Sequence, residues 1–151
     1  GLSVAVGLAL AAKRDLRPSR VVALLSDGEC EEGSTWEAAL SASQFKLDNL
    51  IVVIDSNKLQ ATGVIKEVMN LEPFLDKWKA FGFSAQRIDG HNIQQIVEAL
   101  SKTEKENGCR PQGLPNVIIA DTVKGKGISF LENTVQSHYH VLSEEEYLKN
   151  F

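Results

Sequence analysis

The sequence predicts an α/β fold: a mostly parallel β-sheet of about four strands, with helices on both faces. Short apolar runs alternate along the chain with longer segments of helical apolar spacing. The apolar runs are also rich in β-branched residues and show no polar alternation, which is typical of strands covered on both faces. With 151 residues, the chain has about the length of one domain. We therefore expect a single domain over residues 1–151.

The first half of the chain is expected to alternate helix and strand. Residues 2–16 have a face of small side chains suited to close packing, and the Pro at 18 ends this helix. Residues 21–25 form the first continuous apolar run, which predicts a buried strand. A second helix is expected over 34–46, and a second buried strand over 50–54.

The second half continues the same alternation. The Pro at 73 suits the start of a helix and the Gly at 82 its end, and apolar side chains from Ile93 to Leu100 recur at helical spacing. We expect helices over 71–81, 92–106 and 143–147, a weaker strand over 84–88, a buried strand over 117–120, a loop over 108–115 and irregular structure over most of 125–140.

Composition excludes several classes of protein. The 16 basic and 20 acidic residues give a net charge of −4 without a basic block, so no nucleic-acid surface is expected. No apolar run reaches the ~18 residues that a membrane span needs. Two cysteines are too few for a disulfide framework, which indicates a reducing, cytoplasmic setting. Cys30 is expected to be a passive loop residue, with a reactive thiol as the alternative.

Polar residues with ligand chemistry follow the first two strands. Asp27 and Asn57 stand just beyond strand ends, and adjacent strands lie only about 4.8 Å apart. Their oxygens suit Mg²⁺, with Ca²⁺ as the alternative. Gly28 and Gly33 would let the backbone approach a ligand, and the helix that follows offers N–H groups to an anion. The loops predict a magnesium–diphosphate site, although Asp-Gly and Ser-Asn pairs are also ordinary turn residues.

The spacing of Asp27-Gly28 and Asn57, one βα unit apart, resembles the thiamine diphosphate motif. Five further blocks resemble transketolase, in the order found in its diphosphate-side domain; they lie at 32–39, 46–51, 59–63, 88–92 and 122–127. The match runs from Gly1 to about Glu146. It implies a thiamine-diphosphate-binding fold. Because Gly1 falls inside a family block, we expect this domain to lack its own first elements.

The resemblance also implies a ligand set. Asp27 and Asn57 would bind Mg²⁺ through their side chains, and Leu59 through its backbone carbonyl. Gly28 would place its N–H near the diphosphate, and Asn57 would also belong to the cofactor site. One departure lies in this loop, because Ser26 stands where the family has Gly. Ser is small, so close approach of a ligand should survive.

Glu32 and Glu37 match acids of a hydrogen-bonded carboxylate network that joins the two cofactor sites of the transketolase dimer. The resemblance makes both of them catalytic candidates and places Glu32 at the cofactor as well. Glu37 has an alternative interpretation, because Ser34 and Glu37 have the spacing of a capping box. In that case Glu37 would reach back to the Ser34 N–H.

Lys124 and His138 match two further family positions. Lys124 would lie close to the cofactor, the alternative being a solvated turn. His138 would contact the diphosphate and the reacting oxygens of the substrate, where a histidine titrating near neutrality suits proton handling. Tyr139 departs from the usual Gly, and His140 is a second histidine that could take the role.

The activity that the resemblance implies is two-carbon ketol transfer between sugar phosphates. In transketolases the glutamate that activates the cofactor comes from a separate pyrimidine-binding domain, which nothing here resembles. We therefore expect the N-terminal subunit of a split transketolase, active with a C-terminal, pyrimidine-domain partner in a dimer or heterotetramer. Two alternatives stay open: another thiamine enzyme such as deoxyxylulose-phosphate synthase, which the blocks at 46–50 and 89–91 disfavour, and a non-catalytic assembly or binding subunit.

Overall fold

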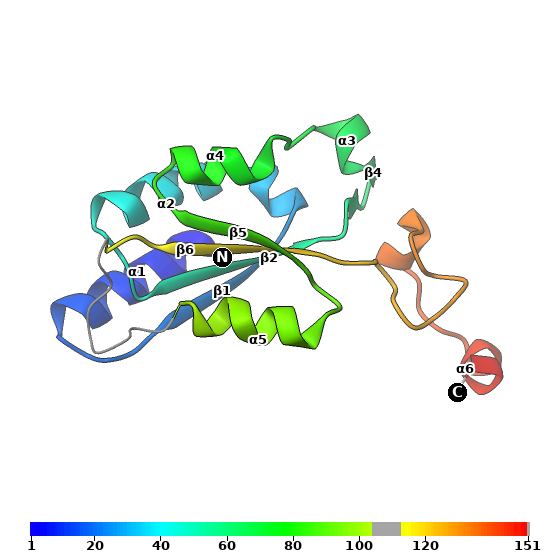
Figure 1. Ribbon diagram of the computed structural model, residues 1–151. Helices are drawn as coiled ribbons and strands as arrows, with labels where there is room; N and C mark the ends of the chain where they lie inside the picture. Colours follow the sequence, from blue (N-terminus) through cyan, green and yellow to red (C-terminus); the bar gives the residue numbers. More distant parts are fainter. Residues whose placement is uncertain (104–112, 151) are drawn as a thin grey trace.

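The computed structural model describes residues 1–103 and 113–150. Its main sheet has four parallel strands in the order β1-β2-β6-β5, which confirms the predicted mostly parallel α/β fold (Figure 1). The strands are β1 (Val21–Ser26), β2 (Leu50–Ser56), β5 (Ser84–Asp89) and β6 (Asn116–Asp121). All four coincide with the strands that the sequence predicts, each of them longer by one or two residues.

Helices cover both faces of the sheet, as expected. They are α1 (Leu2–Arg14), α2 (Gly33–Gln44), α4 (Phe74–Ala80) and α5 (Ile93–Ser101). The connections β1→β2 and β2→β5 cross the sheet in one direction, and β5→β6 returns. Because crossovers between parallel strands are right-handed, α2 and α4 must share one face and α5 must take the other. Figure 1 shows α4 and α5 on opposite sides of the sheet.

The main core lies between the sheet and the helices α1, α2 and α4, which cover one of its faces. At its centre Trp78 is fully buried, and its ring centroid lies 5.0 Å from those of both Trp36 and Phe83. On the other face a smaller cluster packs α5 against β2 and β6. That cluster does not reach β1, where Val22 and Leu24 remain 57% and 71% exposed.

Several segments differ in detail from the sequence-based expectation. Helix α2 begins at Gly33, not Ser34. Residues 59–68, which were assigned no element, form the hairpin β3–β4 (Leu59–Gln60, Gly63–Val64) and the short helix α3 (Ile65–Val68). Within 125–140 there is one 3₁₀ turn, η3 (Val135–His138), and the last helix is α6 (Glu144–Asn150). Helix α5 ends at Ser101 with Lys102 as its C-cap, short of the end predicted for the helix over 92–106. Residues 104–106 and most of the loop predicted over 108–115 lie outside the described residues.

Replacing Trp78 with Ala should lower the free energy of unfolding by about 3–5 kcal/mol, because it opens a cavity among rings that cannot close over it. Urea denaturation followed by circular dichroism measures the change. As a matched control, Ile93→Ala alters a side chain that is 72% exposed, and should shift the same quantity by less than about 0.5 kcal/mol. Equal losses in the two variants would contradict this account of the core.

Candidate functional site

The loops after β1, β2 and β6 meet at the carboxyl edge of the sheet. The strand register pairs Ser26 with Asp55, and Ser56 with Asp121. Asp27 and Asn57, which follow β1 and β2, therefore enter the same small region although they are far apart in sequence. This is the convergence that the sequence predicted.

Asp27 joins the first two of these loops. Its side chain is buried, at 2% exposure. One carboxylate oxygen accepts the Gly28 N–H at 2.9 Å, within the 3₁₀ turn η1 (Gly28–Glu31) that follows β1, and the other accepts the Lys58 N–H at 2.6 Å. Burial raises the pKa of Asp27 above its usual 3.8, and the nearby Asp55 carboxylate acts in the same direction. The two backbone hydrogen bonds and the charge of Lys124 oppose the shift without cancelling it.

Asn57 is buried next to this carboxylate and is held by two hydrogen bonds. Its amide oxygen accepts the Leu59 N–H at 3.0 Å, and its NH₂ group donates to Asp55 at 3.2 Å. Asp55 in turn accepts the hydroxyl of Thr122 from the segment after β6. The Asn57 side chain is thus oriented by its own loop and, through Asp55, by the segment after β6.

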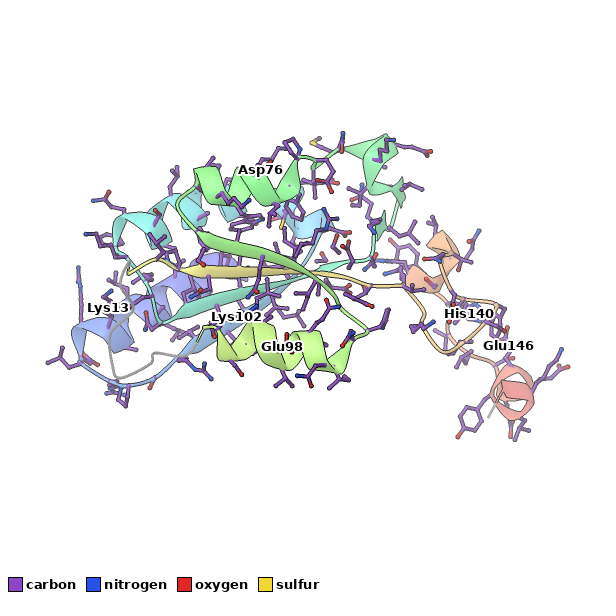
Figure 2. The ribbon with its side chains drawn as sticks, in the orientation of Figure 1. Lys13, Asp76, Glu98, Lys102, His140 and Glu146 are labelled. Atoms are coloured by element: carbon purple, nitrogen blue, oxygen red, sulfur yellow. The ribbon has the colours of Figure 1, made fainter. Side chains whose placement is uncertain are left out.

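The structure places the other sequence-predicted residues at different distances from this centre. Lys124 is half-buried, and its charge acts on Asp27. The turn η3, which carries His138, contacts β3, and the exposed His138 ring lies against Tyr139 with a centroid separation of 4.7 Å. His140, the second histidine, pairs with Glu146 at 3.1 Å; both residues are labelled in Figure 2.

Glu32 and Glu37 are both exposed at the start of α2. Glu32 is the N-cap residue, and its carboxylate accepts the Ser34 hydroxyl at 3.3 Å. The capping-box interpretation of Glu37 is wrong, because the helix begins at Gly33 and Ser34 already lies inside it. The start of α2 has no side-chain cap hydrogen bond, so Glu37 does not cap this helix.

Sequence reasoning missed an ion-pair network beside the site. Arg87 on β5 binds Asp121 through two hydrogen bonds of 2.8 and 3.0 Å, and binds Glu72 at 2.8 Å. The Lys58 ammonium also reaches Asp121, at 3.2 Å. Arg87, Glu72, Lys58 and Asp27 line one cavity of about 460 Å³. The signal in the sequence was one charged residue within the strand predicted over 84–88, Arg87, and another directly after the strand predicted over 117–120, Asp121.

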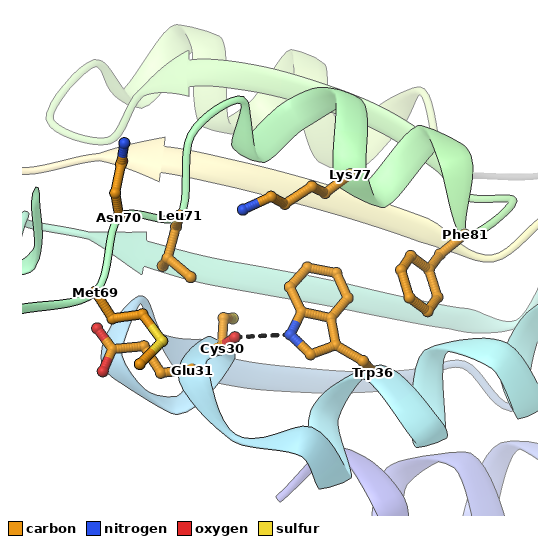
Figure 3. A pocket seen from close by; sticks show the side chains of 8 residues that line it. All are labelled: Cys30, Glu31, Trp36, Met69, Asn70, Leu71, Lys77 and Phe81. Carbon is orange, nitrogen blue, oxygen red and sulfur yellow. Dashed lines mark hydrogen bonds between the residues drawn. The ribbon is translucent and has the colours of Figure 1, made fainter.

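A second cavity, of about 390 Å³, lies on the α4 side of η1 (Figure 3). Trp36 faces Cys30 there, and its indole N–H donates to the Cys30 carbonyl at 2.8 Å. Burial, assisted by neighbouring carboxylates, raises the pKa of the Cys30 thiol to about 12. The expectation of a passive cysteine is therefore supported over that of a reactive thiol.

Two kinds of feature are absent from residues 1–103 and 113–150. No group of three or more His, Cys, Asp and Glu side chains in this part of the chain is arranged to hold a metal ion. The metal-binding set expected here consists of an Asp, an Asn and a backbone carbonyl. Only the Asp is of these four types, so the absence of such a group does not argue against this set. Among the same residues, no helix combines the length and apolar character needed to cross a membrane.

Comparison with known proteins gives consistent matches. Residues 1–150 match the profile of a family described as "Transketolase, thiamine diphosphate binding domain". The chain is 46% identical over 145 residues to the 6-deoxy-6-sulfo-D-fructose transketolase subunit SqwG of Clostridium sp. (strain MSTE9), covering 96% of this chain and 51% of that protein. It is 44% identical over 146 residues to an apulose-4-phosphate transketolase subunit of Actinobacillus succinogenes, covering 97% and 51%.

Among solved structures, the transketolase of Campylobacter jejuni matches with a TM-score of 0.87 at 35% identity, covering 97% of this chain and 23% of that one. The chain spans about half the length of the two curated subunits, at 51% of each.

The pKa values of the two aspartates of the edge are shifted in opposite directions, that of Asp27 upward and that of Asp121 downward. Asp27 should lose its proton above pH 3.8 because it is buried. Burial acts in the same direction on Asp121, but hydrogen bonds from Arg87 and Lys58 hold its pKa below 3.8. Asp27 therefore favours folding below pH 3.8, an effect lost as the pH rises through its folded pKa. Asp121 favours folding above pH 3.8, an effect lost as the pH falls through its folded pKa.

Carbon-13 NMR of the side-chain carboxyls measures both midpoints. In an Arg87→Met variant the Asp121 midpoint should rise, and the Asp27 midpoint should stay above 3.8. A parent chain in which Asp27 titrates below Asp121 would show that this description of the edge is wrong.

Proposed function

The chain belongs to the transketolase family, of which it carries the thiamine diphosphate binding domain, and from this premise we propose that it holds Mg²⁺ and thiamine diphosphate for two-carbon ketol transfer between sugar phosphates. In this proposal it acts with a partner subunit that carries a pyrimidine-binding domain. One observation carries the proposal: Asp27 and Asn57 converge in a buried position at the carboxyl edge of the sheet. That edge is where open parallel sheets bind ligands.

The chemistry of this donor set fits a hard divalent cation. Each oxygen of Asp27 accepts one backbone N–H, so both keep lone pairs for a metal. The Asn57 amide oxygen likewise accepts a single N–H. A cation here would offset the cost of burying the Asp27 charge. With the carbonyl of Leu59, these oxygens would make up the protein part of a Mg²⁺ site, the remaining positions being left to water and phosphate oxygens; Ca²⁺ would also be accepted.

The residues around this cation site suit a diphosphate and a reacting carbonyl. Lys124 adds positive charge close to Asp27, and a metal ion with a lysine offsets the charge of a diphosphate. Gly28, the first residue of the turn after Asp27, would place its N–H near the diphosphate. When bound, thiamine diphosphate supplies the carbon nucleophile that adds to the ketose carbonyl. His138, on the turn beside β3, would hold or move a proton at the substrate's reacting oxygen.

Two observations support a partner subunit. The Clostridium and Actinobacillus relatives are themselves named as transketolase subunits. The chain also leaves large apolar side chains exposed: Val22 and Leu24 on β1, and Val4 and Leu8 on α1. The two pairs lie on different sides of the sheet, and each offers apolar surface of the kind that protein contacts cover. Glu32 and Glu37, exposed on α2, would face such a contact and belong to the carboxylate network between cofactor sites.

The two relatives carry the names of different sugars, a sulfonated fructose and a phosphorylated apulose. Both are named for a sugar that carries an anionic group. We propose a substrate of that class for this chain, with phosphorylated ketoses as the first set to be assayed.

Replacing Asp27 with Ala should abolish Mg²⁺-dependent binding of thiamine diphosphate, because it removes the buried carboxylate of the cation site. Isothermal titration calorimetry with and without Mg²⁺ measures this. Asp76→Ala, at an exposed carboxylate on α4, should bind as the parent does. Unchanged binding by the Asp27→Ala variant would sink the assignment of this site.

The chain alone should bind the cofactor and show no ketol transfer, because the activating glutamate is expected on the partner. Mixed with a subunit that carries the pyrimidine-binding domain, it should transfer a two-carbon unit from a ketose phosphate. Binding should also raise the unfolding midpoint, since a ligand at about 100 times its Kd adds about 2.7 kcal/mol. No shift with Mg²⁺ and thiamine diphosphate would favour an assembly role, and ketol transfer by the isolated chain would rule out the need for a partner.

A further inference from the structure

Lys58 stands between the two proposed metal-binding residues after β2, and its backbone has an unusual conformation. Its φ is +67°, in the left-handed region that residues with a Cβ rarely adopt. The conformation turns the chain between Asn57 and Leu59. It also directs the Lys58 N–H to Asp27 at 2.6 Å, while the Lys58 carbonyl accepts the Ile65 N–H at 3.0 Å. Such backbone persists only where its surroundings hold it in place.

The side chain of Lys58 supplies one of those constraints. Its ammonium group binds Asp121 at 3.2 Å. Asp121 is itself fixed by the guanidinium of Arg87, through two parallel hydrogen bonds of 2.8 and 3.0 Å. A bidentate pair of this kind sets direction as well as distance. Glu72 holds a third position on the same guanidinium, at 2.8 Å. The charges therefore form a continuous connection from β5, through β6, to the loop after β2.

We propose that Arg87 and Asp121 are positioning residues for the cation site: they hold Lys58 in its left-handed conformation, and so keep the Asn57 amide oxygen and the Leu59 carbonyl aligned with Asp27. The inference rests on the proposed function, because it concerns the same Mg²⁺ and thiamine diphosphate. Neither residue is proposed to contact the metal. Outer residues that orient metal ligands typically change metal affinity by about 10–100-fold when they are replaced.

The Arg87–Asp121 pair differs from an ordinary surface ion pair in its position. Arg87 and Asp121 side chains are 29% and 34% exposed, while the Lys58 side chain that binds Asp121 is 61% exposed. Arg87 lines the same cavity as Asp27 and Lys58. By contrast, Lys79 and Asp76 form a pair within α4 whose side chains are 52% and 70% exposed. That second pair is a matched control, since its removal breaks an ion pair without touching the loop after β2.

The test titrates Mg²⁺ into the chain at a fixed concentration of thiamine diphosphate, followed by calorimetry. Arg87→Met and Asp121→Asn should each raise the apparent Kd for Mg²⁺ by about tenfold, whereas Lys79→Met should leave it unchanged. Asp121→Asn is nearly isosteric, so it keeps the test open if Arg87→Met does not fold, as judged by circular dichroism.

A rescue variant separates positioning from general destabilisation. Asn tolerates the left-handed region far better than Lys, so Lys58→Asn should need the network less. Adding Arg87→Met to Lys58→Asn should therefore change the apparent Kd for Mg²⁺ by less than about threefold, short of the effect of a lost orienting residue. A full tenfold loss in that double variant would overturn the positioning role.

The remaining outcomes fall into two distinct kinds. If the parent chain binds thiamine diphosphate with Mg²⁺ and Arg87→Met and Asp121→Asn bind Mg²⁺ as tightly, the positioning role is overturned while the proposed function stands. If the parent chain itself binds no cofactor, the proposed function is overturned, and the positioning role with it.

Discussion

The hydrogen bonds of the Asp27 carboxylate hold together the loops at the carboxyl edge of the sheet. The carboxylate accepts one N–H from its own loop and one from the loop after β2, so that a single buried side chain joins two strand ends. Two backbone donors stabilise its charge only in part, since burial still raises its pKa. A cation bound here, as proposed, would offset the cost of removing this carboxylate from water. The same side chain therefore joins two loops of the fold and stands at the centre of the proposed cation site.

Sequence reasoning located Asp27 and Asn57 because their convergence follows from consecutive strands. β1 and β2 are neighbours in the sheet as well as in the chain, so loops one βα unit apart were bound to meet. The Arg87–Asp121 pair could not be found in the same way. It depends on β5 lying beside β6 at the far edge, and on a register that pairs Arg87 with Ile119, so that Asp121 lies two residues further along the neighbouring strand. Apolar periodicity reports which segments are strands and not their order in the sheet.

Some residues in the blocks that carried the family resemblance stabilise the fold. Asn49 donates from its buried amide to the Ala9 carbonyl at 2.9 Å, which ties the start of β2 to α1. At Gly90 a Cβ would lie 2.5 Å from the Thr122 side chain, so only glycine allows the loops after β5 and β6 to approach this closely. His91 then accepts the Val123 N–H at 2.8 Å, next to Lys124. This hydrogen bond joins the loops after β5 and β6.

The placement of the aromatic rings has an optical consequence. The chain has two tryptophans, and their ring centroids are 5.0 Å apart. Intrinsic emission at tryptophan wavelengths therefore arises from one small region between α2 and α4. Trp36 in that region is hydrogen-bonded to the carbonyl of Cys30, in the turn that begins directly after Asp27. A shift of that turn would change the polarity around one indole, so the protein carries its own fluorophore next to the loop that begins at Asp27.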